Sequence, residues 1–476
     1  MHILIIGAGR IGRSVAENLV NESNDITIVD QDAERVSALE TRLDLRGVTG
    51  NALSPSVLES AGANDADMIL AVTANDETNM AVCLLASQLF NIPTRIARVR
   101  NQELRQYPRL LAEEGFQITS TIWPEQALNE SLLRLIEFPE ALQIIDFAEG
   151  KAVLFCVRAV AGSPLVGRPI GDLAVHLPHV PARIVSVFRR NRRLDISSET
   201  VIESGDEVIA LSSGRDVRRV ISELRHHEER IRRIMIAGNA RLGVQLASLL
   251  NGPEGRRGYT ITILDEDAAL CTSLAAAVPK DTELVTANLT DEEALTELCV
   301  DRCDLFISLS SRDENNIMGA LLAKKLGARR VIALTDSDTF SALMQGTQID
   351  VTVSSTQATI GELLRHVRRG DVLAAHSLRR GVAEALEIVA HGNKRSSKVV
   401  GKRMADFDLP EGVEIAALVR DTDDIEEPEV LIAQKDVVVS PEDRVIVFVP
   451  GKRVIPQVEK LFAVDVGFFR SEEHTS

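Results

Sequence analysis

Three glycines near the start of the chain have the spacing of a phosphate-binding turn. The apolar residues 3–6 run directly into the sequence GAGRIG, in which Gly7, Gly9 and Gly12 form a Gly-x-Gly-x-x-Gly pattern. Gly7 allows a tight turn from strand to helix, Gly9 lets backbone approach a pyrophosphate, and Gly12 lets the helix pack on the strand. The N–H groups that begin the helix then face the phosphates. The same pattern occurs in folds that bind no nucleotide, so its surroundings must decide. The expected cofactor-binding residues here are Gly7, Ala8, Gly9, Arg10, Ile11 and Gly12.

A carboxylate follows these glycines at the distance expected of a ribose ligand. Asp30 ends the second apolar run, about 20 residues after the glycines, where it can accept both hydroxyls of an adenosine ribose. The alternative is a surface aspartate without a ligand. Gln31 and Asp32 follow it, and no arginine is present to meet a 2′-phosphate. The pattern therefore favours NAD(H) over NADP.

Further polar residues stand where the next strands are expected to end. Asn51 and Ala52 in TGNAL are placed to border an adenine, and Thr73, Ala74 and Asn75 in VTANDETN are placed to close over ribose and phosphates. The alternative is local turn chemistry, because an Asn at this position can equally cap the following helix. One residue can serve both purposes.

Two arginines follow on the fifth expected strand. Arg98 and Arg100 are two residues apart, so their side chains lie on one face near the carboxyl edge of a parallel sheet, where ligands bind. Two guanidinium groups there can hold additional phosphate charge, such as that of ATP or ADP. The alternative is a solvated strand edge.

The chain contains this unit twice. ILIIGAGRIG at 3–12 returns as IMIAGNARLG at 234–243, and QALNESLLRLIEFPEAL at 126–142 returns as QATIGELLRHVRRGDVL at 357–373. The separation stays at about 231 to 237 residues through several further segments, which indicates an internal duplication. The corresponding candidate residues of the second half are Gly238, Asn239, Ala240, Arg241, Leu242, Gly243, Asp265, Asn288 and Ser310.

The second copy departs from the first in two ways. Ala240 replaces the middle glycine, so close approach of backbone to a pyrophosphate is harder. Leu334 and Asp336 stand at the positions of Arg98 and Arg100. We therefore expect the second site to bind a nucleotide weakly, and a triphosphate least well.

Alternating strands and helices must position these residues. Strands are expected at 3–6, 26–30, 68–73 and 95–99, with helices at about 10–19 and 77–90. This order predicts an α/β fold with a doubly wound parallel sheet in each half, followed by a small α+β domain. Gly205-Asp206 and Glu442-Asp443 are expected to form tight turns before the last strand of each small domain.

The repeat also suggests where the domains divide. The expected domains are 1–134 and 229–366 for the two Rossmann-type nucleotide-binding units, and 135–228 and 367–469 for the two small α+β units. The last residues, RSEEHTS at 470–476, have no counterpart in the repeat. They resemble translated sequencing-adapter DNA and are expected to be a non-native tail.

Composition and motifs exclude several classes of function. The net charge of −17 disfavours nucleic acid as a partner. No apolar run is long enough to span a membrane, and Met1 leads directly into a strand, so a cytoplasmic protein is expected. No metal site is expected, and Cys299 and Cys303 are interpreted as small core residues. The chain lacks a Tyr-Lys pair four residues apart and an HExxH motif, so it is not expected to be an enzyme.

The residues resemble one family over essentially the whole chain. The doubled IIGAGRIG…VD…TGNA…VTANDETN…IARVR, followed by SPLVGRPIGDL, is similar to the TrkA family of tandem RCK (KTN) regulators of bacterial potassium transport. The resemblance implies a homotetrameric ring that binds NAD(H) and ATP. It also implies a location at the inner face of the cell membrane, beneath a potassium-translocating subunit of the TrkH or TrkG type. Gly7 to Gly12, Asp30, Thr73 and Arg98 carry over as the first NAD site.

The leading hypothesis is thus a nucleotide-sensing regulatory subunit of a potassium uptake system. One alternative is an NAD-dependent oxidoreductase with an unrecognised substrate site, and another is a nucleotide-dependent scaffold unrelated to transport. The helices at 126–136 and 357–367 have apolar faces, which either form subunit contacts or pack within the chain.

Overall fold

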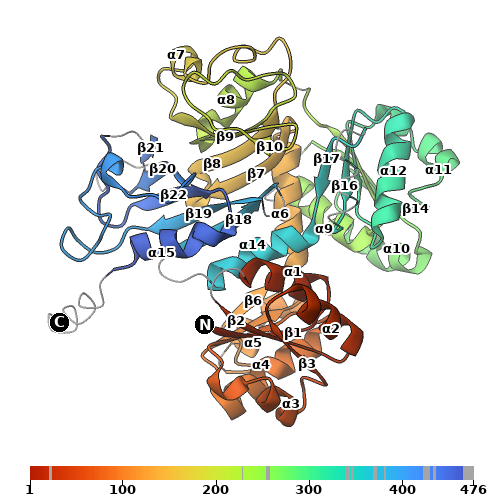
Figure 1. The fold of residues 1–476 in the computed structure, drawn as a ribbon. Coiled ribbons are helices and arrows are strands. Elements are labelled where there is room, and N and C mark those ends of the chain that lie inside the picture. Colours follow the sequence, from red (N-terminus) through yellow and green to blue (C-terminus); the bar gives the residue numbers. More distant parts are fainter. Residues whose placement is uncertain are drawn as a thin grey trace.

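A computed structural model of the chain shows four β-sheets arranged as two similar halves (Figure 1). The structure describes residues 1–20, 24–112, 114–227, 229–252, 258–337, 340, 344, 348–367, 372–379, 382–421, 429–432 and 436–464. The expected tail at 470–476 lies outside these residues.

The first sheet is parallel throughout, with strand order β3-β2-β1-β4-β5-β6. Its strands are β1 (His2–Ile6), β2 (Asp25–Asp30), β3 (Arg46–Thr49), β4 (Met68–Ala71), β5 (Thr94–Arg98) and β6 (Ser120–Ile122). The accompanying helices are α1 (Arg10–Leu19), α2 (Ala33–Arg42), α3 (Pro55–Ser60), α4 (Asp76–Phe90), α5 (Pro108–Leu111) and α6 (Pro124–Glu137). The order reverses between β1 and β4, which is where ligands bind in doubly wound sheets.

The expected elements are found with two corrections that concern the site. The strand expected at 95–99 ends at Arg98, so Arg100 lies in the loop after β5 and not on the strand. The strand expected at 68–73 ends at Ala71, so Thr73 lies in the loop before α4. The backbone leaves the sheet there because Asn75 begins the capping of α4.

An antiparallel sheet follows, in the order β10-β9-β11-β8-β7. Its elements are β7 (Ala141–Phe147), β8 (Ala152–Arg158), α7 (Asp172–His176), β9 (Ala182–Arg189), β10 (Arg192–Arg193), β11 (Glu207–Ser213) and α8 (Val217–Leu224). The expected turn before the last strand is present, and Gly205 adopts the positive φ of +92° that this turn requires.

The second half repeats both sheets strand for strand. Its parallel sheet has the order β14-β13-β12-β15-β16-β17, and its antiparallel sheet has the order β18-β19-β22-β20-β21. The elements of the parallel unit are β12 (Arg233–Ala237), α9 (Ala240–Asn251), β13 (Thr260–Asp265), α10 (Ala268–Leu274), β14 (Thr282–Thr286), α11 (Glu292–Glu297), β15 (Leu305–Ser308), α12 (Asp313–Lys325), β16 (Arg330–Leu334), β17 (Val351–Val353) and α14 (Ser355–Val367). Those of the small unit are β18 (Val372–Leu378), β19 (Ala383–Val389), β20 (Glu414–Arg420), β21 (Glu429–Ile432), β22 (Arg444–Val449) and α15 (Ile455–Phe462). The tandem duplication is therefore structural.

The two halves exchange their connecting helices. In Figure 1, α14 of the second half lies against α1 of the first, and α6 of the first half packs on α9 of the second. Leu363 of α14 shares a buried cluster with Val15 of α1, and Leu132 of α6 shares one with Leu246 of α9. The buried apolar residues of these helices thus pack within the chain, as one of the two interpretations of the 126–136 and 357–367 segments expects.

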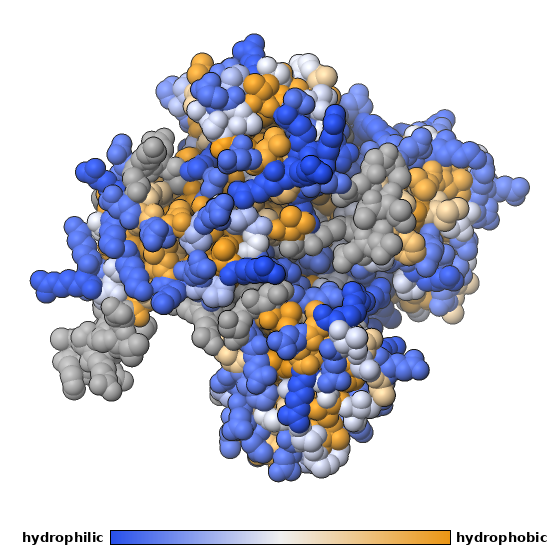
Figure 2. Space-filling model, in the orientation of Figure 1, coloured by the Kyte–Doolittle hydropathy of each residue, from blue (hydrophilic) through white to orange (hydrophobic). Residues whose placement is uncertain are grey.

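The two antiparallel sheets pack against each other. Phe147 and Phe188 of the first sheet share one buried cluster with Phe448 of the second. The face seen in Figure 2 is largely hydrophilic, with apolar side chains in smaller areas. Within the described residues, no helix has the length and apolar character needed to cross a bilayer.

The cysteine interpretation needs one correction. Cys303 is buried, as a small core residue should be, but Cys299 is exposed. The two do not share a helix face, because Cys299 adopts a left-handed conformation (φ +57°) just before a short 3-10 turn. Among the described residues, no group of three or more His, Cys, Asp or Glu side chains could hold a metal ion.

Candidate nucleotide-binding site

The glycine-rich turn of the first half has an open side and a closed side. Gly7 adopts φ +107°, and a Cβ added at Gly12 would lie 1.8 Å from the Gly7 carbonyl oxygen. A Cβ added at Gly9, in contrast, would meet no atom within 4 Å. Gly12 therefore permits the close packing of α1 on the turn, and Gly9 leaves the space above it open. The turn also places Ala8, Arg10 and Ile11 around the start of α1, which begins at Arg10.

Asp30 lies beside this turn at the end of β2. Its Oδ2 accepts a hydrogen bond of 2.6 Å from the Ala8 N–H, and its Oδ1 accepts one of 2.9 Å from the Asp32 N–H. Each carboxylate oxygen can accept more than one hydrogen bond, so both retain capacity for ribose hydroxyls. Asp32 itself caps α2 by accepting from the N–H groups of Glu34 and Arg35.

A buried asparagine, which sequence reasoning missed, joins the loop after β4 to the end of β5. Oδ1 of Asn79 accepts from the Thr73 N–H (2.9 Å) and from the Thr73 hydroxyl (2.7 Å). Its Nδ2 donates to the carbonyl oxygen of Arg98 (2.9 Å). Asn316 repeats the backbone part of this arrangement in the second half, where it accepts from the Ser310 N–H and donates to the Leu334 carbonyl oxygen. This repetition of an asparagine at one position of the duplicated segment was the signal in the sequence.

The other residues predicted to contact the nucleotide in the first half make hydrogen bonds within or near their own loops. Asn51 is exposed, and its Oδ1 accepts from the Leu53 N–H at 3.0 Å, while Ala52 is buried. Asn75 caps α4 by accepting from the Thr78 N–H at 2.7 Å. The capping role considered for Asn75 is therefore present. Ala74 lies in the same loop, where its carbonyl oxygen accepts from the Arg100 side chain.

The two arginines gather over this loop. Nη1 of Arg98 donates to the Thr73 carbonyl at 3.4 Å, and no described residue accepts a hydrogen bond from its buried Nε. Burial lowers the pKa of Arg98, and the nearby charge of Arg100 lowers it further. Two like charges held this close, one of them partly desolvated, favour binding of an anion.

Two acids face this pair. Asp76, the first residue of α4, forms an ion pair with Arg100 (3.8 Å) and accepts a hydrogen bond from the Arg100 N–H, and its charge opposes the fall in the pKa of Arg98. The second acid is Glu125. Glu125, at the start of α6, is mostly buried, and burial raises its pKa. A hydrogen bond from Gln102 and the charges of Arg100, Arg241 and Arg98 oppose that rise. Glu125 was not among the predicted residues, because its sequence neighbours belong to a helix far from the glycines.

In the second half, side chains of the protein itself accept hydrogen bonds from the N–H groups at the start of the corresponding helix. Asn239 caps α9 by accepting from the Leu242 N–H at 3.1 Å, whereas Gly9 has no side chain with which to cap α1. Asp265 accepts from the Ala240 N–H at 2.7 Å, one residue further along than in the first half. Helix α9 consequently starts at Ala240, whose methyl group is fully buried.

A larger side chain also narrows the second turn. Leu289 stands where the first half has Ala52, and a Cβ added at Gly238 would lie 2.8 Å from a Leu289 methyl carbon. Asn288 is exposed and its Nδ2 donates to Glu266, and Ser310 follows β15 as expected. Arg241, Leu242 and Gly243 lie in the first turn of α9. The predicted residues of the second half therefore lie at the corresponding positions, but there is less open space around the glycine-rich turn than in the first half.

The residues that follow each glycine-rich turn contact the other half. Arg10 forms an ion pair with Asp336 (3.3 Å), and Arg241 lies near Glu125. Burial would raise the pKa of Asp336, but hydrogen bonds from the Thr356 N–H and two serine hydroxyls, with the charge of Arg10, lower it. An arginine in the first turn of α1 and another in the first turn of α9 thus each face an acid of the other half.

Comparisons with known proteins agree with this architecture. The family model described as the TrkA-N domain matches residues 3–117 and 234–355, one segment in each half. The TrkA-C domain model matches residues 154–225.

Curated relatives match over almost their whole length. A Trk system potassium uptake protein TrkA from Halomonas elongata is 45% identical over 469 residues, which cover 98% of this chain and 100% of that protein. One from Vibrio alginolyticus is 42% identical, covering 97% of this chain and 98% of that protein. These relatives are named for potassium uptake and not for an oxidoreductase activity, in agreement with the expectation that the chain is not an enzyme.

Solved structures share the fold. The GsuK RCK domain superimposes with a TM-score of 0.58 at 19% identity, covering 96% of this chain and 95% of that chain. A GsuK channel bound to NAD has a TM-score of 0.58 at 18% identity, covering 96% and 79%.

Proposed function

This chain belongs to the TrkA family, and from that premise we propose that it is the nucleotide-sensing regulatory subunit of a potassium uptake system, with NAD(H) and ATP as its ligands. The observation that carries the proposal is the difference between the two glycine-rich turns. The turn of the first half is open above Gly9 and is backed by Arg98, whereas Asn239 caps the turn of the second half.

NAD(H) and ATP are proposed to compete for the first turn. Asp30 supplies acceptors for an adenosine ribose, and the N–H groups of α1 face the phosphates of either ligand. Arg98 and Arg100 add positive charge for a third phosphate, which NAD(H) does not carry. ATP would thus contact two arginines with its third phosphate, a contact that NAD(H) does not make. The comparison structure bound to NAD supports this assignment through its fold alone.

The bound nucleotide is proposed to gate a membrane potassium-translocating subunit of the TrkH or TrkG type. A tetrameric ring at the inner face of the cell membrane, with the domains divided near 135, 229 and 367, is part of the same proposal. Gating requires that each nucleotide bind two arrangements of the ring with different affinity. The exchanged helices α6 and α14 support this, since they join the two turns mechanically.

The experiment is a calorimetric titration of the full chain with NADH and with ATP, each alone and then in competition. We expect the two ligands to exclude each other, with at most one site per half. Arg98→Ala should weaken ATP binding by roughly tenfold, because a charge-assisted contact to phosphate is lost. It should change NADH binding less.

Arg109→Ala is the matched control, because this exposed arginine lies on α5, and its removal should leave both affinities unchanged. A chain that binds NADH tightly and does not bind ATP would contradict the sensor proposal. The NAD-dependent oxidoreductase alternative would then gain support, and consumption of NADH with candidate metabolites would test it. A further test expresses the chain in cells that lack their own regulator and measures potassium uptake. Restored uptake indicates a transport role, whereas unchanged uptake favours a scaffold unrelated to transport.

A further inference from the structure

A cavity lies where the first antiparallel unit meets the second parallel sheet, away from both glycine-rich turns. Its volume is about 340 Å³. Arg330 is the first residue of β16 and Lys324 is near the end of α12, so the cavity lies at the amino edge of that sheet. The expected nucleotide position, near Ser310, is at the opposite, carboxyl edge. The described residues that line the cavity are Leu142, Arg158, Arg225, Lys324, Arg330, Gln348, Ile349 and Asp350.

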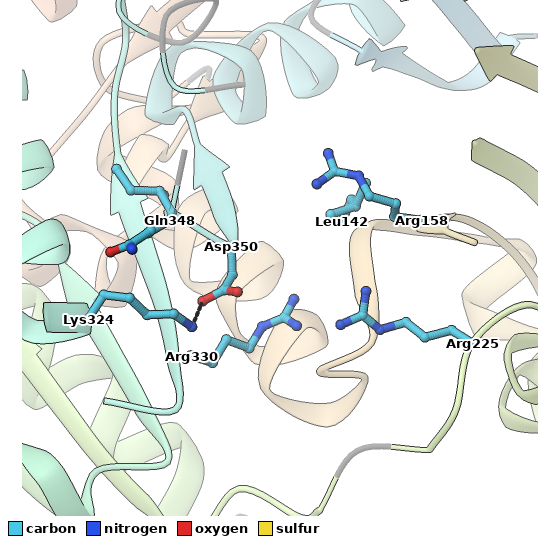
Figure 3. A pocket seen from close by; sticks show the side chains of 8 residues that line it. Leu142, Arg158, Arg225, Lys324, Arg330, Gln348 and Asp350 are labelled. Carbon is cyan, nitrogen blue, oxygen red and sulfur yellow. Dashed lines mark hydrogen bonds and ion pairs between the residues drawn. The ribbon is translucent and has the colours of Figure 1, made fainter. Parts of the chain in front are cut away.

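Positive charge dominates this lining. Four of the eight described residues are cationic, and Asp350 is the one acid among them. The guanidinium groups of Arg225 and Arg330 point toward each other from opposite sides, as Figure 3 shows. This concentration is local, because the whole chain carries a net charge of −17.

The cations are held in place by the fold. Arg330 is only 4% exposed and donates to the Ala141 carbonyl at 2.9 Å. Lys324 pairs with Asp350 at 2.8 Å, and the same carboxylate accepts from the Val331 N–H. Arg158 pairs with Glu207 at 3.0 Å. Arg158, Lys324 and Arg330 are therefore positioned before any ligand arrives, which lowers the entropy cost of binding.

Like charges that converge in a partly enclosed space repel one another more strongly than they do in bulk water. An anion placed between them relieves that repulsion. Guanidinium groups form paired, charge-assisted hydrogen bonds with phosphate oxygens, and an ammonium group adds a further donor. The cavity volume corresponds to about ten water molecules at roughly 30 Å³ each, which leaves room for a phosphate group.

We propose that this cavity binds a phosphate group, either as inorganic phosphate or as part of a small phosphorylated metabolite, and that the ligand clamps the two halves together. Arg158 and Arg225 come from the first half, whereas Lys324 and Arg330 come from the second. A phosphate held by both pairs stabilises the arrangement in which they converge. The site is independent of the nucleotide site proposed above.

The test is a calorimetric titration of the full chain with inorganic phosphate, against chloride at the same ionic strength. We expect saturable phosphate binding that exceeds the chloride background. Arg225→Gln and Lys324→Gln, one from each half, should each weaken it by roughly tenfold. The controls are Arg215→Gln, on an exposed turn of the first antiparallel unit, and Lys325→Gln, the neighbour of Lys324 on α12. Both should retain phosphate binding within about twofold, because neither residue lines the cavity.

Thermal melting in phosphate-free buffer identifies variants that have lost structure. Arg225→Gln and Lys324→Gln should melt with the wild type there and should lose the rise in Tm that phosphate produces. Phosphate binding no stronger than chloride overturns the proposal, and so does equal binding by the wild type and both cavity variants.

A second arm with AMP distinguishes the source of the phosphate. If AMP displaces inorganic phosphate and Arg225→Gln weakens both, the ligand is a phosphorylated metabolite. If phosphate binds and AMP does not displace it, the ligand is the free ion, and both results support the cavity as the site. AMP binding that Arg225→Gln leaves unchanged belongs to another site.

Discussion

At the scale of single residues, burial determines the charge that the first site presents. Arg98 is partly desolvated, which lowers its pKa, and Glu125 is partly desolvated, which raises its own. The two groups therefore depend on each other, since each favours the charged form of its neighbour. Asn79 fixes the backbone on which Arg98 stands. The site is thus a set of charges on a rigid support, which suits reversible binding better than proton transfer.

Replacement of Glu125 tests this dependence through pH. Because the pKa of Glu125 is raised in the folded state, its contribution to stability is present below the unfolded value of about 4.3 and is lost as pH rises through the folded value. Glu125→Gln should therefore melt above the wild type at pH 8 and lose that advantage at pH 4. Thermal melting between these pH values provides the measurement.

Glu130→Gln, on the exposed face of the same helix, serves as the control and should follow the wild type at every pH. A Tm difference between Glu125→Gln and the wild type that stays constant with pH would show that the carboxylate charge has no part in it. The same variant should bind ATP more tightly, because it removes a negative charge beside the two arginines.

At the scale of elements, the two halves differ most clearly at the start of one helix, which is α1 in the first half and α9 in the second. Helix α1 begins after a glycine, so its first N–H groups are presented to the space above Gly9. Helix α9 begins after Asn239, whose side chain accepts one of these N–H groups. The strands and helices around the two turns are otherwise the same. The weaker nucleotide binding proposed for the second half thus rests on this helix start and on Leu289 beside it, and the surrounding sheet keeps the same strand order.

The double variant Asn239→Ala with Ala240→Gly should restore phosphate access in the second half. A side-chain cap is worth about 1 kcal/mol, so its removal should raise ADP affinity at this turn by roughly fivefold. The measurement is calorimetry in an Asp30→Ala background, which suppresses the first site. Ala240→Gly alone, which keeps the cap, is the control. If the single and double variants bound ADP with equal affinity, the Asn239 cap would not be the cause of weak nucleotide binding in the second half.

At the scale of the whole molecule, the halves are interlocked. Helix α14 completes the covering of the first parallel sheet, α6 does the same for the second, and the two antiparallel sheets share a core. Arg10 and Asp336 connect the glycine-rich turn of one half to the α14 start of the other. A ligand that shifted one turn would therefore act on elements of both halves, as the proposed gating requires.

A cavity in α14 should accordingly loosen the first half. Leu363→Ala removes a fully buried side chain, at an expected cost of about 2–5 kcal/mol. We expect faster amide hydrogen exchange in α1 (Arg10–Leu19), some 350 residues earlier in the chain, together with a lower Tm. Leu249→Ala on α9, where the side chain is half exposed, should change neither. If amide hydrogen exchange became faster only in the second half, the packing of α14 against the first half would be contradicted.

The sequence by itself determined the duplication, the parallel order of strands and the positions of the glycines, Asp30 and the paired arginines. These follow from periodicity and from short-range geometry, in which a residue's neighbours in the chain are also its neighbours in space. Even the cap at Asn239 is a local signal, since asparagine is a favoured residue at that position.

Only the tertiary structure decided which surfaces meet. The pairing of α6 with α9 and of α14 with α1, the position of Glu125 beside Arg241, and the cavity between Arg225 and Arg330 all join residues more than 100 positions apart. Amphipathic patterns show that a helix face is buried but not what buries it. The partner depends on the packing of the whole chain, which no local pattern records.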